Sequence, residues 1–190
     1  MRMSPGMTHR DENTVLTVKN RSHTVTAQFE VGSGGADGVL VAQGGRFAGW
    51  LLYVVQGRPA YCHNWFNSGY YCFYYYVKGS DVLPPGEVAI QYQFDFDGGA
   101  PGAGGTGTLL VNGSVVAEER IDKTVPFVFS ADETMDIGED SASPVTSDYP
   151  AGDLNKFAGD LAWVQIDIEE DDVSHIEAPE ATYHRILARQ

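Results

Sequence analysis

Apolar and polar residues alternate along much of the chain, and this period of two indicates strands that bury one face. The inward positions of the two clearest segments are Val25, Ala27, Phe29 and Val31 in residues 23–31, and Val88, Ile90, Tyr92 and Phe94 in residues 87–96. Apolar runs in residues 38–43, 49–55, 107–111, 114–121 and 162–168 predict further strands.

Turn signals rich in glycine, asparagine and proline separate these segments at intervals of about ten residues, as in all-β domains. Asn112-Gly113 lies between two apolar runs and is typical of a two-residue hairpin turn, because both central residues must take positive φ. Since no strand–helix alternation is present, we predict an all-β fold, a jelly-roll β-sandwich of two antiparallel sheets.

The chain divides into three parts. Residues 1–12 are typical of a flexible leader, residues 13–170 form the predicted β-sandwich domain, and residues 171–190 form an acidic connector followed by a short C-terminal helix. In that helix Pro179 suits the first turn, and Tyr183, Ile186 and Leu187 share one stripe.

The net charge of −14 is concentrated in the last third of the chain. Residues 132–180 contain fifteen acids and one base, Lys156, whereas the rest of the chain contains eleven of each. This field repels nucleic acid and anionic membranes, so we expect neither as a partner. The sequence also shows neither a membrane-spanning apolar stretch nor a signal-peptide pattern, so the compartment stays open, with the cytoplasm as the default.

Two cysteines, Cys62 and Cys72, are too few for a disulfide scaffold of the secreted type. We expect two buried free thiols, and a bridge across a hairpin stays as the alternative. The histidines and cysteines show no spacing of a transition-metal site.

Residues 61–77, YCHNWFNSGYYCFYYYV, form a dense aromatic run that we expect to turn near Asn67 to Gly69. Exposed rings on such a hairpin stack on sugar rings, whereas buried ones fill the core, and both interpretations stay open. Arg46, in GGRFAGW, either reaches an acidic group of a partner or belongs to a structural turn. The candidate ligand-binding residues are Trp65, Tyr71, Tyr74, Tyr76 and Arg46.

Residues 129–140, FSADETMDIGED, contain five acids. Carboxylates are the ligands that calcium prefers, and Asp132, Asp136 and Asp140 are the candidate calcium ligands, although the spacing is not that of an EF-hand. The alternative that we favour is a loop whose acids face water or cap backbone amides. Acid–base hydrolysis by Asp132 and Asp136 is the weakest interpretation.

Four segments, VKNRSHTVTA (18–27), GVLVAQGGRFAGWLLYV (38–54), FDFDGGAPGAGGTGTLLVNG (94–113) and TVPFVFSADETMDIGEDSASPVTSDY (124–149), resemble the C-terminal domain of large bacterial arylsulfatases. The final residues, 157–190, resemble it too, so the resemblance runs from about Asn13 to the last residue. It implies a concanavalin A-like sandwich appended to a sulfatase catalytic domain.

The sulfatase nucleophile motif Cys/Ser-x-Pro-x-Arg is missing from the chain, so the resemblance implies a domain that is not an enzyme by itself. We therefore expect a non-catalytic accessory domain of an arylsulfatase, which docks on the catalytic domain in cis or trans, shapes its cleft or mediates oligomer contacts such as a homodimer. The alternative function is a stand-alone carbohydrate-binding module that uses the aromatic hairpin.

Overall fold

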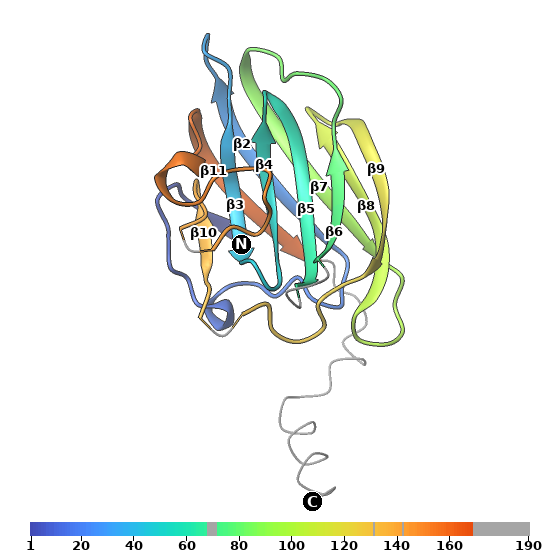
Figure 1. The fold of residues 1–190 in the computed structure, drawn as a ribbon. Helices are drawn as coiled ribbons and strands as arrows, with labels where there is room; N and C mark the ends of the chain where they lie inside the picture. The colour runs from blue at the N-terminus through green and yellow to red at the C-terminus, as the bar shows by residue number, and fades with distance from the viewer. Residues whose placement is uncertain (68–71, 131, 142, 169–190) are drawn as a thin grey trace, which may run out of the picture.

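Two antiparallel sheets face each other in the computed structural model, which describes residues 1–67, 72–130, 132–141 and 143–168 (Figure 1). The strand orders are β1-β11-β2-β7-β8-β9 in the six-stranded sheet and β10-β3-β4-β5-β6 in the five-stranded sheet. This arrangement confirms the predicted all-β sandwich of jelly-roll type.

The strands of the six-stranded sheet are β1 (Arg2–Met3), β11 (Asp160–Ile168), β2 (His23–Val31), β7 (Gly86–Phe96), β8 (Ala103–Val111) and β9 (Ser114–Lys123). Those of the five-stranded sheet are β10 (Met135–Ile137), β3 (Gly38–Gly44), β4 (Gly49–Val55), β5 (Arg58–Asn67) and β6 (Cys72–Lys78).

The main core lies between the sheets, where alternate residues of each strand meet. Val25, Ala27 and Phe29 of β2 are fully buried, as are Val88 and Ile90 of β7, so the inward positions predicted for these strands are confirmed. Their outward neighbours are more exposed, which is why the period of two is visible in the sequence.

A second apolar cluster lies on the outer face of the five-stranded sheet. Residues 138–156, described except for position 142, cover this cluster, and we call them the cover segment. Figure 1 shows the orange cover segment crossing in front of β3 and β4. Because both faces of β3 and β4 are covered, these strands have continuous apolar sequences instead of alternating ones. The buried members of the cluster are Val39, Ala42, Leu51, Tyr53, Ala60, Cys62 and Val145.

The first residues of the chain belong to the sandwich. Arg2 and Met3 pair with Gln165 and Val164 of β11, and the Met3 side chain is 2% exposed. The segment predicted as a flexible leader, residues 1–12, therefore begins with an edge strand.

The predicted C-terminal helix, with Pro179 to Leu187, lies outside the described residues. The helical elements among the described residues are two 3-10 turns, Glu12–Thr14 and Gly152–Asn155. No helix in the described part of the chain is long and apolar enough to cross a membrane.

The predicted hairpin turn at Asn112-Gly113 is confirmed. The two residues have φ of 49° and 80°, and they join β8 to β9. Both angles lie in the left-handed region that this turn requires.

Candidate ligand-binding site on the five-stranded sheet

Three consecutive outward positions of β6 carry Tyr74, Tyr76 and Lys78, because alternate residues of a strand share a face. The two tyrosine rings are half-buried, and their centroids lie 5.9 Å apart at an interplanar angle of 32°. The Lys78 ammonium lies 4.1 Å from the centroid of the Tyr76 ring. We call this set of three residues the β6 face.

A groove of about 340 Å³ adjoins the β6 face at the end where β4 turns into β5. Its volume lies within the range of roughly 300–1,000 Å³ that is usual for small-molecule sites. Arg58 and Lys78 bring positive charge to the groove, and Asp148 brings a carboxylate. The full lining is Val55, Gln56, Arg58, Pro59, Ala60, Lys78, Gly79 and Asp148.

Polar bonds hold the charged groups of the groove in place. Lys78 donates to Asp148 at 2.6 Å, and Arg58 donates through Nε to the Ser80 carbonyl at 2.8 Å and through Nη1 to the Gln56 carbonyl at 3.1 Å. The groove therefore presents side chains whose positions are set before any ligand arrives.

The cover segment also fixes the tyrosines of the sheet. The hydroxyls of Tyr76 and Thr146 are 2.7 Å apart, and the buried Tyr53 donates to Asp148. Burial, and then the hydrogen bond to the Asp148 carboxylate, raise the pKa of Tyr53 well above its ordinary value. Tyr53 is therefore a neutral donor that holds Asp148 at the rim of the groove.

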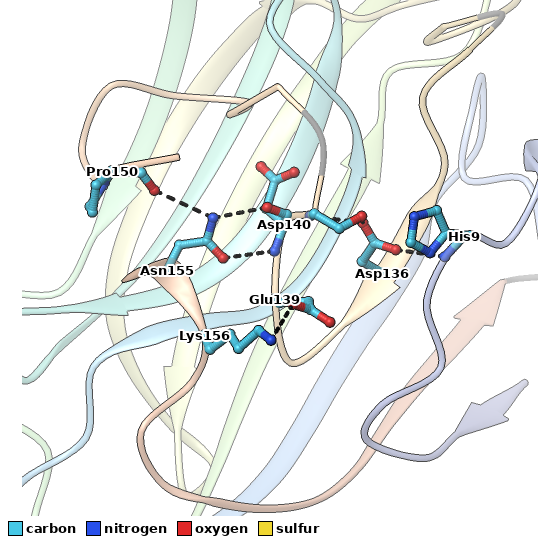
Figure 2. A network of polar contacts seen from close by, with 8 residues as sticks. His9, Asp136, Glu139, Asp140, Pro150, Asn155 and Lys156 are labelled. Atoms are coloured by element: carbon cyan, nitrogen blue, oxygen red, sulfur yellow. Dashed lines mark hydrogen bonds and ion pairs between the residues drawn. The ribbon is translucent and has the colours of Figure 1, made fainter. Parts of the chain in front are cut away.

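Asp140 and Asn155 fold the cover segment back on itself (Figure 2). The Asn155 side chain accepts from the Asp140 amide at 2.9 Å and donates to the Asp140 carbonyl at 2.8 Å. The Asp140 carboxylate accepts from the Val145 amide at 3.1 Å and from the Tyr149 hydroxyl. Burial raises the pKa of Asp140 to about 6.

Asn64 of β5 ties the cover segment to the sheet. Its side-chain amide donates to the Val145 carbonyl at 3.2 Å and to the carbonyls of Gly45 and Arg46 at 3.2 and 2.8 Å. The bonds place Val145, which is fully buried, on the outer apolar cluster.

The acids proposed as calcium ligands serve different purposes. Asp136 is 2% exposed and accepts from the amides of His9 and Ser141 at 2.7 and 3.0 Å (Figure 2), whereas Asp132 is exposed. Throughout the described residues, no group of three or more His, Cys, Asp or Glu side chains could hold a metal ion. The structure therefore does not bring Asp132, Asp136 and Asp140 together as a ligand set, and Asp136 and Asp140 cap backbone amides instead.

The predicted aromatic platform is divided between two faces. Trp65 packs against the main core, donates to the Thr124 carbonyl at 3.1 Å and contacts Phe73 edge-on, so it lies on the opposite face from Tyr74 and Tyr76. Tyr71 lies outside the described residues. Arg46 is exposed in the turn between β3 and β4, where its amide donates to the Ser143 hydroxyl at 2.9 Å, and it does not line the groove.

Sequence reasoning missed the polar half of this site. Lys78 could have been found from the sequence, since it lies two positions after Tyr76 on the same strand and must share its face. Arg58 and Asp148 could not, because the hairpin register and the path of the cover segment bring them to the groove from elsewhere in the chain.

Cys62 is a free, buried thiol, and burial raises its pKa above the ordinary value. In the strand register Cys62 lies opposite Tyr76, whereas Cys72 lies opposite Asn67. The two cysteine positions are thus not cross-strand neighbours.

Neither a protein-family model nor a curated protein sequence matches the chain. Two similar solved structures are those of the CBM40 carbohydrate-binding module of the IT-sialidase from Ruminococcus gnavus, one bound to α2,3 sialyllactose and the other to α2,6 sialyllactose. Each has a TM-score of 0.52 and 14% sequence identity; the matches cover 80% of this chain and 79% and 80% of the two module chains. This likeness shows the fold.

These findings contradict the resemblance to arylsulfatase C-terminal domains. No family model matches the chain, and the similar structures reported above are of a carbohydrate-binding module and not of a sulfatase domain. The prediction of a sulfatase accessory domain is therefore wrong, and no finding supports a sulfatase catalytic domain as a partner. Three of its four internal segments consist of strands and glycine-rich turns, which β-sandwiches in general require.

Proposed function

We propose that this protein is a carbohydrate-binding module without catalytic activity of its own, and that it binds its ligand on the β6 face and in the adjoining groove. The observation that carries the proposal is the pair of half-exposed tyrosine rings, 5.9 Å apart, beside a groove with charged walls. The likeness in fold to a carbohydrate-binding module that binds sialyllactose supports it.

The chemistry of a sugar suits this surface. A pyranose ring has apolar C–H faces that pack on an aromatic ring, and its rim of hydroxyls needs hydrogen-bond donors and acceptors. Tyr74 and Tyr76 supply the rings, while Arg58, Lys78 and Asp148 supply the polar groups. Because the Tyr76 hydroxyl is bonded to Thr146, its ring loses little freedom when a ligand binds.

The groove is poorly equipped for glycoside hydrolysis. Such hydrolysis commonly requires two carboxyl groups that flank the bond to be cleaved. Asp148 is the one carboxylate among the residues that line this groove, and Lys78 and Tyr53 already engage it. The arrangement favours binding over bond cleavage.

A glycan array followed by calorimetry tests the proposal. We expect the folded chain to bind at least one oligosaccharide, and Tyr74→Ala to weaken that binding at least about tenfold, which corresponds to about 1.4 kcal/mol. The matched control is Phe47→Ala, since Phe47 is an aromatic residue that is 63% exposed and does not line the groove.

Thermal melting shows whether each variant is folded. Equal affinities for the wild type and a folded Tyr74→Ala variant would place the sugar elsewhere on the molecule. The absence of binding to any glycan on the array would overturn the proposed function itself.

A further inference from the structure

A small cavity of about 20 Å³ lies between the two sheets. β2 and β7 contribute His23 and Tyr92 from one sheet, and β5 contributes Tyr61 and His63 from the other. The segments that contain Lys19 and Phe129 complete its wall. A cavity this size has room for a single water molecule, which needs about 10–15 Å³ of probe-occupied volume.

Three buried polar atoms on the cavity wall have no hydrogen-bond partner among the described residues: His23 Nε2, His63 Nε2 and Tyr92 Oη. The side chains are 6%, 5% and 0% exposed, respectively. Buried polar atoms without partners cost roughly 1–3 kcal/mol each, so three at one cavity indicate a partner that is not part of the protein.

The imidazole of His23 is set to accept a hydrogen bond. Its Nδ1 lies 3.1 Å from the Arg21 carbonyl, which can only accept, so the proton of the neutral ring resides on Nδ1. Nε2 then offers its lone pair to the cavity. Burial lowers the pKa of His23 to about 4 and that of His63 to about 3, so both rings are neutral near neutral pH.

A charged occupant does not fit this site. Lys19 brings an ammonium group to the wall, where it pairs with Glu12 and lies over the Phe129 ring, and a metal cation would be repelled by it. An anion would find one imidazole lone pair, from His23, directed at it. A neutral molecule that both donates and accepts suits the three atoms.

We propose that one ordered water molecule binds in this cavity and bridges the two sheets through His23 Nε2, His63 Nε2 and Tyr92 Oη. Three partners are the usual number for a buried water. The bridge provides a directional contact between the two sheets near one end of the strands, where the surrounding contacts are mainly between apolar and aromatic side chains, such as Tyr61 stacked on Tyr92 at 3.5 Å.

The Tyr92→Phe variant bears on the water, because it removes a hydroxyl and keeps the ring. The neighbouring Tyr61 hydroxyl interacts with Tyr92 Oη, so the crystal structure described below decides whether the partner that is lost is the water or Tyr61. If the water is bound, the variant loses a hydrogen bond and its melting temperature falls by about 2–4 °C. If the hydroxyl has no partner, its removal relieves a buried unsatisfied group, and the melting temperature stays the same or rises.

A high-resolution crystal structure of the wild-type protein gives the second measurement. A density peak within hydrogen-bond distance of all three atoms would confirm the water. The absence of such a peak, with the three side chains placed as described, would overturn the proposal. The outcome is independent of sugar binding, since the cavity and the groove share no residue.

Discussion

At the scale of single residues, the buried acids of the cover segment are structural groups. Asp140 is 1% exposed and receives hydrogen bonds from Val145 and Tyr149. These hydrogen bonds favour the ionised carboxylate, whereas burial favours the protonated form. Burial has the larger effect and raises the pKa of Asp140 to about 6. The sequence gives the residue type at this position, but the burial that decides its charge depends on packing.

Asp140 makes the free energy of unfolding depend on pH. Its folded pKa of about 6 exceeds the ordinary value of 3.8, so the folded state binds more protons between these values. The contribution of Asp140 is therefore fully present below pH 3.8 and is lost as the pH rises through 6. The Asp140→Asn variant has no titrating group at this position. We predict that its free energy of unfolding, relative to that of the wild type, rises by about 2–3 kcal/mol between pH 4 and pH 7.

Denaturant titrations of both proteins across this pH range measure the difference. Groups outside the immediate neighbourhood of Asp140 titrate alike in the two proteins and cancel. A difference that is constant with pH would contradict the raised pKa.

The two buried histidines act in the opposite direction. Their folded pKa values, about 4 for His23 and about 3 for His63, lie below the ordinary 6.5. The unfolded state therefore binds more protons, and their contribution is present above pH 6.5 and is lost as the pH falls toward the folded values. The free energy of unfolding of the wild type falls as the pH is lowered from 7 to 4.5. We predict that it falls by about 2–3 kcal/mol less in the His63→Phe variant.

The measurement is again a denaturant titration at the two pH values. His9→Phe is the control, since His9 is exposed on the surface. If the His63→Phe and wild-type proteins lost equal stability on acidification, His63 would not be neutral in the fold.

At the scale of elements, the cover segment decides what the five-stranded sheet presents to solvent. It covers the outer faces of β3 and β4, and its border toward β6 lies where Thr146 meets Tyr76 and Asp148 meets Lys78. The β6 face is left beyond this border. The groove is thus a product of where one loop lies.

Asn64 anchors this loop through its three hydrogen bonds. We predict that Asn64→Ala lowers the free energy of unfolding by about 2–3 kcal/mol, because three carbonyls lose their donor. We also expect faster amide hydrogen exchange at Val145, measured by NMR. The control is Gln28→Ala, on the outer face of the six-stranded sheet, which should change neither the free energy of unfolding nor the exchange rate at Val145. The same exchange rate at Val145 in both variants would mean that Asn64 is not the anchor.

The elements also show how far sequence reasoning reaches. β2 and β7 were predictable because each buries one face and so alternates, and the turn at Asn112-Gly113 was predictable because it needs two residues at positive φ. β10 was not, since three residues are too short to show a period. The path of the cover segment was not either, because Val145 binds Asn64, 81 positions away.

The candidate site was predictable only in part for the same reason. Tyr74 and Tyr76 share a face by alternation. Which face carries Trp65 depends on the hairpin register, and the sequence alone does not show that register. That register aligns Asn64 with Tyr74 and contains an irregularity between Asn64 and Phe66. Trp65 consequently lies with the inward residues of β6.

At the scale of the whole molecule, charge and shape agree with a selective binding surface. The chain carries a net charge of −14, yet the groove has two basic side chains and one acidic one. A second groove of about 520 Å³, between Glu30, Asp37 and Asp160, has no basic side chain in its lining. The β6 face is therefore the better surface for a sugar.

An NMR titration of the isotopically labelled chain with a panel of soluble oligosaccharides tests the central claim most directly. It reports both whether a sugar binds and where it lies. The account predicts amide shift changes for at least one oligosaccharide, centred on Tyr74, Tyr76, Lys78 and Asp148, with none at Glu30 or Asp160. Shift changes centred on another surface would contradict the proposed site, and unchanged spectra with every sugar would contradict carbohydrate binding.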